Sequence, residues 1–87
     1  MRIISQGGRT DLPYEEISLC IDREDIVAMH KDKEYLMARY STIDKAKKAM
    51  EMLHITYKGN KVEEVYQEGT NYYHPTFQFP ADEDVKV

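Results

Sequence analysis

The sequence has little cysteine, glycine or proline, and it has no tryptophan. Its single cysteine excludes an intramolecular disulfide and a zinc site made of several thiolates, as is typical of proteins from reducing compartments. No stretch approaches the roughly 18–20 apolar residues that a membrane span needs, and the first residues lack the apolar run of a signal peptide. We therefore expect a cytoplasmic protein that does not associate with membranes.

The composition is that of a small globular domain. Of the 87 residues, 41% are hydrophobic and 32% are charged, which suits one core near the lower limit of size for unaided folding. The net charge of −4 is concentrated late in the chain: residues 1–58 carry ten basic and ten acidic side chains, whereas residues 59–87 carry two and six. A neutral body with an acidic tail argues against non-specific binding to nucleic acids, which depends on cationic side chains.

Alternating apolar and polar residues in the first forty positions predict an antiparallel meander of about four strands. Gly7-Gly8 has the composition of a tight hairpin turn, after which residues 9–12 can pair back until Pro13 ends the ladder. Short polar turns separate the later strands. The predicted strands cover residues 1–6, 14–22, 25–30 and 35–40.

Alternation also assigns the side chains of these strands to faces of the sheet. In the last strand it places Leu36, Ala38 and Tyr40 on one face and Met37 on the other. Cys20 lies in the alternating segment YEEISLCID. We expect its thiol to be buried and unreactive, because free cysteines are among the most buried residues.

The main predicted helix covers residues 41–58, where apolar residues recur along one stripe at helical spacing. Ser41 followed by Asp44 is similar to a capping box, and Gly59-Asn60 has the composition of a helix stop. The stripe is too short for a coiled coil, so we expect it to pack on one face of the sheet and complete an α+β domain over residues 1–58. The stripe consists of Ile43, Ala46, Met50, Leu53 and Tyr57.

Residues 59–87 form a predicted C-terminal arm, with a short helix over 61–68 and an edge strand over 71–79. The arm is rich in aromatic side chains, whereas Pro75 and Pro80 exclude a central strand. We expect the arm to pack on the edge of the sheet, either in its own chain or in a second copy, which would make a homodimer. The alternative is a disordered acidic tail.

Three segments of the sequence, MRIISQGGRTDLPYE, YSTIDKAKKAMEMLHITY and FQFPADEDV, carry a resemblance to known proteins. They resemble small proteins of unknown function from phages and from prophage regions of Gram-positive bacteria. The resemblance implies a protein of a mobile genetic element that works in the cytoplasm of a bacterial host. It implies no activity, no cofactor and no catalytic residue.

The sequence contains no residues at the spacing of a catalytic, cofactor or metal site. His30, His54 and His74 are far apart, and none has a second ligand at metal-site spacing nearby. We therefore predict a non-enzymatic interaction module that self-associates or binds a host or phage protein.

Two alternative functions remain open, a single-stranded nucleic-acid-binding protein and a small ligand-binding or enzymatic domain with a pocket between helix and sheet. The predicted interaction surface combines the basic outer face of the helix with the aromatic side chains of the arm. It consists of Lys45, Lys47, Lys48, Tyr72, Tyr73, Phe77 and Phe79.

Overall fold

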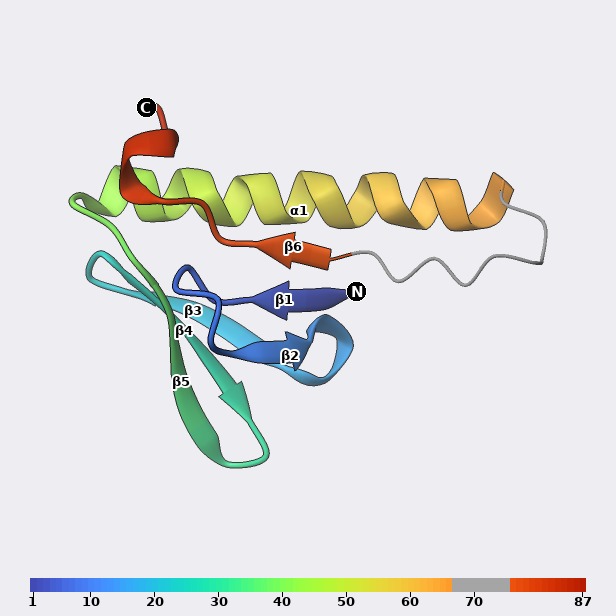
Figure 1. Ribbon diagram of the computed structural model, residues 1–87, viewed down its shortest axis with the longest axis horizontal. Helices are drawn as coiled ribbons and strands as arrows, with labels where there is room; N and C mark the ends of the chain where they lie inside the picture. The colour runs from blue at the N-terminus through green and yellow to red at the C-terminus, as the bar shows by residue number, and fades with distance from the viewer. Residues whose placement is uncertain (67–75) are drawn as a thin grey trace.

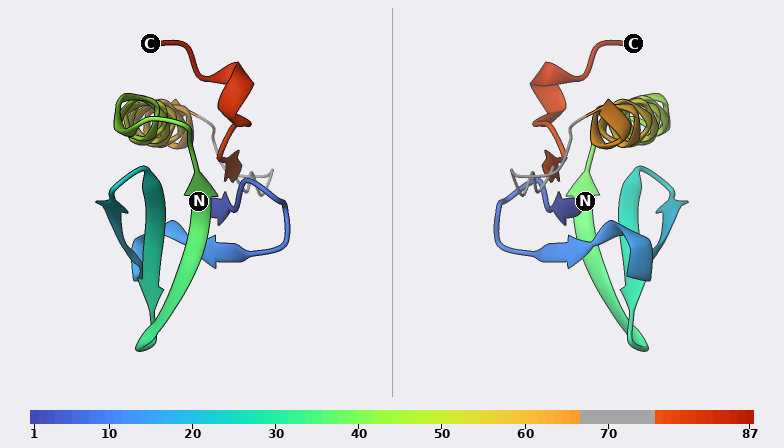
Figure 2. Two further views of the ribbon diagram at one scale, coloured as in Figure 1. Left: turned by 90° about the vertical axis from the view of Figure 1, so that its left-hand side faces the viewer. Right: turned by 90° about the vertical axis from the view of Figure 1, so that its right-hand side faces the viewer.

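The computed structural model describes the backbone of residues 1–66 and 76–87 and the side chains of residues 1–58 and 76–87. It confirms the predicted α+β class: within these residues it has one long helix and two three-stranded sheets (Figure 1). The strands number six rather than about four, because the segment after the glycine turn and part of the arm are strands too. The helix lies across one end of both sheets (Figure 2). One cluster of buried side chains contains residues from both sheets and from the helix.

The first sheet has β1 (Arg2–Ile4) at its centre, between β2 (Asp11–Pro13) and β6 (Thr76–Gln78). β1 and β2 are antiparallel, whereas β6 runs parallel to β1. Ile3, in the middle of β1, has 0% exposure. The shortest strands of the molecule therefore surround one of its most buried residues.

The turn between β1 and β2 has the predicted hairpin geometry. Gly8 has a φ of 78°, a conformation that favours glycine. Ser5 closes the turn, because its N–H donates to the Thr10 carbonyl (2.8 Å) and its hydroxyl accepts from the Thr10 N–H (3.1 Å). β2 ends at Pro13, as predicted, since proline has no N–H for the ladder.

The second sheet is an antiparallel meander of β3 (Ser18–Asp22), β4 (Asp25–His30) and β5 (Lys33–Arg39). The prediction of a strand over residues 14–22 is wrong for its first residues. There the chain forms a 3₁₀ helix, η1 (Tyr14–Glu16), instead. The Met1 amino group donates to the Glu15 carboxylate (3.1 Å) and holds this turn against the start of β1. Alternation along the chain cannot predict such a contact between distant residues.

A β-bulge in β5 changes which of its side chains are buried. Ile26 pairs with Ala38 and Val27 pairs with Leu36, so Met37 is an extra residue in β5. Met37 and Ala38 are both buried, whereas Leu36 is 50% exposed. The prediction that Leu36 and Ala38 lie on the same face of the sheet is therefore wrong, because side chains alternate strictly only in a strand without a bulge.

The helix α1 (Ile43–Tyr66) is capped by Thr42 rather than by the predicted Ser41. The Thr42 hydroxyl accepts a hydrogen bond from the Lys45 N–H (3.2 Å), two residues inside the first helical residue. A threonine at this position satisfies one of the backbone N–H groups that a helix start leaves without an intrahelical partner.

The predicted end of the helix at residue 58 is also wrong, because α1 continues to Tyr66. A single glycine such as Gly59 costs a helix interior only about 1 kcal/mol, which neighbouring residues can offset. The apolar spacing that predicted a separate helix over residues 61–68 belongs to the same helix up to Tyr66, and residues 67 and 68 lie outside the described part of the chain.

The buried face of α1 consists of Ala46, Ala49 and Leu53, each with 0% exposure. The predicted stripe fails at Ile43, which is 48% exposed. Helical side chains lean toward the N-terminus, so the side chain of the first helical residue projects past the start of the helix. Further along, the Tyr57 ring packs on a tyrosine of η1, with 4.6 Å between ring centroids.

The arm packs on its own chain. β6 forms an edge of the first sheet, and beyond it the Phe79 N–H donates to the Ile4 carbonyl (3.1 Å). Phe77, Phe79 and Val85 are 8%, 1% and 2% exposed. Residues 76–87 thus contribute three side chains to the core, and the alternative of a disordered tail is wrong for them. The rest of the predicted edge strand, residues 71–75, lies outside the described residues.

We predict that Leu53→Ala lowers the free energy of unfolding by about 2–5 kcal/mol, because it removes a fully buried side chain and leaves a cavity. Chemical denaturation measures this change. Ile55→Ala is the matched control in the same helix, because Ile55 is 62% exposed, and it should change stability by about 0.5 kcal/mol or less. A loss below about 1 kcal/mol for Leu53→Ala would contradict tight packing on this face.

Candidate functional site

The structure separates the predicted interaction residues instead of bringing them together. Phe77 and Phe79 lie in the core, with their rings edge to face and 5.2 Å between centroids. Both rings are therefore removed from the surface on which the sequence placed them, because β6 turns them inward. Tyr72 and Tyr73 lie outside the described residues.

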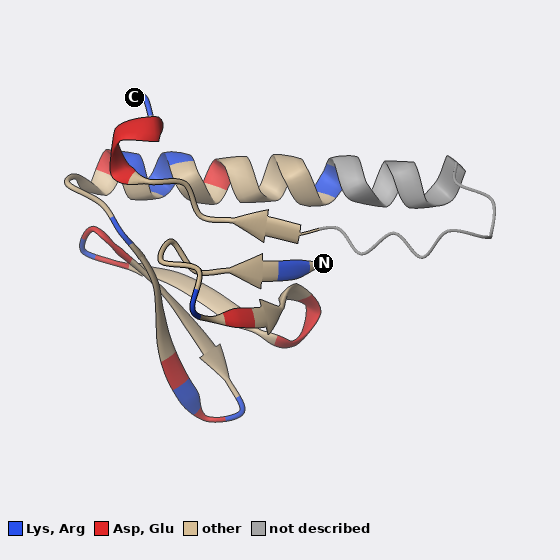
Figure 3. Cartoon of the chain, in the orientation of Figure 1, with Lys and Arg blue, Asp and Glu red and all other residues tan. Residues whose placement is uncertain are grey.

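The three lysines of the predicted surface differ in their surroundings, although basic and acidic positions lie close together along the first half of α1 (Figure 3). Lys45 forms an ion pair with Asp82 (3.2 Å) and is largely covered. The Lys48 ammonium lies 3.6 Å from the Glu51 carboxylate. Lys47 is exposed. A continuous cationic surface does not result.

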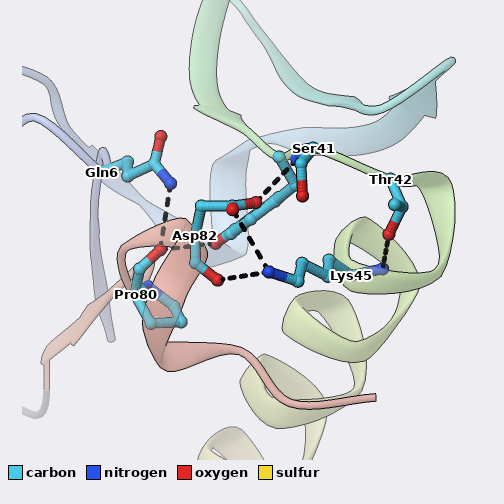
Figure 4. A network of polar contacts seen from close by, with 7 residues as sticks. Gln6, Ser41, Thr42, Lys45, Pro80 and Asp82 are labelled. Carbon is cyan, nitrogen blue, oxygen red and sulfur yellow. Dashed lines mark hydrogen bonds and ion pairs between the residues drawn. The ribbon is translucent and has the colours of Figure 1, made fainter.

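Lys45 belongs instead to a polar cluster that fastens the C-terminal segment to the start of α1 (Figure 4). The Ser41 N–H donates to an Asp82 carboxylate oxygen (2.6 Å), and the Lys45 ammonium donates to the other oxygen (3.2 Å) and to the Asp82 carbonyl (3.0 Å). The Ser41 N–H and, after it, the Lys45 ammonium hold the pKa of the Asp82 carboxyl below its usual value, against partial desolvation. We call Ser41, Lys45 and Asp82 the tail latch.

Gln6 connects the same segment to both sheets. Its backbone N–H donates to the Met37 carbonyl (2.7 Å), and its side-chain oxygen accepts from the Arg39 N–H (3.1 Å). Its side-chain N–H donates to the Pro80 carbonyl (3.1 Å). One residue thus joins the end of β1 to β5 and to the C-terminal segment.

Tyr40 completes these contacts, because its hydroxyl donates to the Pro80 carbonyl (2.8 Å). Burial, and then the charge of Asp82, raise the pKa of Tyr40 to about 12. The hydroxyl therefore remains a neutral donor at ordinary pH. Together with the tail latch, it fastens the C-terminal segment to the end of β5 and to the start of α1.

A different surface has the exposed apolar character that the predicted one lacks. It is the side of the meander that faces away from the core, here called the outer face. Cross-strand pairing arranges its side chains in three rows. The rows are Asp22–Asp25–Arg39, Cys20–Val27–Leu36 and Ser18–Met29–Glu34.

The outer face exposes apolar side chains around Val27, which is itself buried at 7% exposure. Leu36 and Met29 are 50% and 42% exposed, and Cys20 is exposed too, so the prediction of a buried thiol is wrong. Charged residues gather near the hairpin ends and leave the middle of the strands uncharged (Figure 3). The sequence contains the signal at Cys20, which alternates with the partly buried Leu19 and Ile21, but the bulge conceals it at Leu36.

A notch of about 230 Å³ borders the outer face along β5. Leu36, Met37 and Ala38 form its apolar side, and the turn after β1 forms the other side. Arg9 and Arg39 both line it. Arg39 donates to the Asp25 carboxylate (3.0 and 3.2 Å), whereas no ion pair or hydrogen bond occupies the Arg9 side chain among the described residues.

A second pocket, of about 420 Å³, lies between α1 and the start of the meander. Its lining is mostly apolar, with one imidazole. Such a volume suits a small molecule. The lining residues are Tyr14, Ile17, Leu19, Met50 and His54.

The other histidines do not add a chemical site. His30, at the end of β4, has a buried Nε2 atom with no hydrogen-bond partner in the described part of the chain. His74 lies outside that part. Among the described side chains, those of residues 1–58 and 76–87, no three His, Cys, Asp or Glu groups come together as metal ligands would.

Comparisons of the chain with protein-family models, with curated proteins and with solved structures found no match. Of the helices in the described residues, none is long and apolar enough to cross a membrane. The function is therefore inferred from the geometry of the chain and from the resemblance of its sequence segments.

We predict that the tail latch makes stability fall at acid pH. The pKa of Asp82 is lowered in the folded state, so its contribution is present above the usual value of 3.8 and is lost as pH falls through the folded-state pKa. Asp82→Asn should therefore reduce stability at neutral pH and flatten the acid limb of a plot of melting temperature against pH. Glu83→Gln, an exposed neighbour in the same turn, should leave that limb unchanged. If the melting temperatures of wild type and Asp82→Asn fell by the same amount as the pH is lowered, this role of Asp82 would be contradicted.

Proposed function

We propose that the protein is a non-enzymatic protein-interaction module of a phage or prophage, and that it docks on other proteins through the outer face of the meander. The observation that carries the proposal is the half-exposed middle of this face, where Leu36 and Met29 lie on a sheet whose other side is buried. The origin of the module in a mobile element rests on the resemblance of its sequence segments.

The outer face has the composition of a docking surface: an apolar centre between charged rows. Covering the exposed halves of Leu36 and Met29 would contribute about 1 kcal/mol each, given roughly 1.5–3 kcal/mol for complete burial of such side chains. The rows that contain Asp22 and Arg39 at one end, and Glu34 at the other, would set the orientation of a partner, because charges contribute more to specificity than to affinity.

The nucleic-acid alternative has less support. Single-stranded nucleic acids are bound by aromatic stacking platforms beside cationic grooves. Phe77 and Phe79 are core residues, and Lys45 is engaged by Asp82. The residues left on that surface have no stacking ring among those described.

The pocket between α1 and the meander favours a second candidate function, the binding of a small apolar molecule. Its volume lies within the usual range of ligand pockets. A ligand of this class would place a ring against Ile17, Leu19 and Met50 and direct a hydrogen-bonding group to His54.

We predict that Leu36→Glu abolishes capture of the protein's specific partners, because it puts a charge at the centre of the docking surface. Tagged wild type and variant would be incubated with lysate of a Gram-positive host, and retained proteins would be identified by mass spectrometry. Ile55→Glu, the same kind of change at a more exposed site on the helix, is the control and should retain the wild-type set. Equal retention by Leu36→Glu would contradict docking on the outer face.

For the second candidate we predict that small aromatic acids shift the NMR signals of the Met50 methyl and of the His54 ring. His54→Ala should weaken the binding of these acids, because it removes the polar group of the pocket, while binding of an uncharged aromatic analogue should change less. Shifts spread over the whole chain, or none at millimolar concentrations, would contradict a ligand site here.

A further inference from the structure

We infer that the partner of the outer face is a second copy of this chain, and that the two meanders pack face to face around a two-fold axis that runs along β4. This inference rests on the proposed docking function of the outer face and adds the identity of the partner. It differs from a dimer made by exchanging the arm, because β6 pairs with β1 of its own chain.

The charges of the outer face are divided between its two sides. Along β3 the charged residue is acidic, Asp22. Along β5 the notch presents Arg9 and Arg39 at one end, where the Arg39 side chain is 68% exposed, and Glu34 is the acidic residue at the other end. At the end that carries Asp22 and Arg39, an acid on β3 and arginines beside β5 make the surface complementary to itself when it is turned by half a rotation.

A two-fold axis along β4 performs this rotation. This rotation leaves each row at the same position along the strand direction, so that each row faces the same row of the second copy. It sets β3 of one copy opposite β5 of the other. Asp22 of each copy then lies opposite Arg39 of the other, and Cys20 lies opposite Leu36. The Ser18 hydroxyl comes opposite the Glu34 carboxylate, to which it can donate. Each polar group thus meets a polar group, and each apolar group meets an apolar one.

The residues of β4 lie on the axis and face their own copies. Met29, which is 42% exposed, therefore meets its own copy there, whereas Val27, at 7% exposure, is already covered within its own chain and lies beneath the contact. Asp25 also faces itself, but its carboxylate is bound by Arg39 of its own chain, which also holds the pKa of Asp25 below its usual value. In the dimer, Arg39 then lies between Asp25 of its own chain and Asp22 of the second copy, and it offsets part of the like charge on the axis.

The other two-fold arrangement, with its axis across the strands, fits less well. It inverts the order of the rows, so Asp25 would lie against Met29 and Asp22 against Ser18. Each arrangement leaves one acidic residue opposite Ser18, Glu34 in the first and Asp22 in this one, so what counts against this one is the Asp25 carboxylate set against the apolar Met29. That arrangement sets Cys20 against Cys20 of the second copy, which distinguishes the two experimentally.

Sedimentation velocity over a range of concentrations tests the association, and isotope-filtered NMR of a mixture of labelled and unlabelled native protein tests the geometry. We expect a concentration-dependent dimer with intermolecular contacts between the Met29 methyls and between Leu36 and Cys20. Asp22→Arg should weaken the dimer about tenfold, because it places like charges opposite each other. Glu83→Arg, the same change of charge in the C-terminal turn, should leave dimerisation unchanged.

A monomer at all concentrations would overturn this inference, whereas partner capture that depends on Leu36 would still support the docking function. A dimer with Cys20–Cys20 contacts, or one that tolerates Asp22→Arg, would overturn the axis along β4. Loss of both self-association and Leu36-dependent capture would overturn the proposed function as well.

Discussion

Parallel pairing between β1 and β6 is the contact on which the rest of the molecule depends. A strand of three residues has too few hydrogen bonds to persist alone, and it persists here because β2 and β6 bind both of its edges. Ile3, which is completely buried, pairs with Phe77 of β6. The tail latch then connects this sheet to the start of α1, and Gln6 connects it to β5. Two sheets and a helix become one core through segments far apart in sequence.

The bulge in β5 connects this core to the outer face. By burying two successive residues, Met37 and Ala38, it lets β5 contribute more to the core than alternation allows. The same extra residue turns Leu36 outward. Packing inside the domain and apolar exposure outside it therefore have one cause, which is the bulge.

Local features of the fold could be predicted from the sequence, and non-local features could not. The hairpin at Gly7-Gly8, the helix that contains Leu53 and the turns of the meander depend on neighbouring residues, and the structure has all of them. The parallel pairing of β6, the Thr42 cap and the start of β3 depend on contacts between distant segments or on competing local alternatives. The predicted site failed for a related reason: an aromatic residue such as Phe79 has the same signature whether it binds a partner or fills a core.

The pairing of β1 with β6 also has a consequence for how the chain folds during its synthesis. The β1–β2 hairpin and the meander can form from neighbouring residues soon after they leave the ribosome. β1, however, has an open edge until Phe77 and Phe79 emerge, and for that period the hydrophobic residues of the first sheet remain accessible to chaperones and to other nascent chains. The core of this domain can therefore close only after residues 76–87 have emerged, so the first sheet is the last part of the domain to be completed.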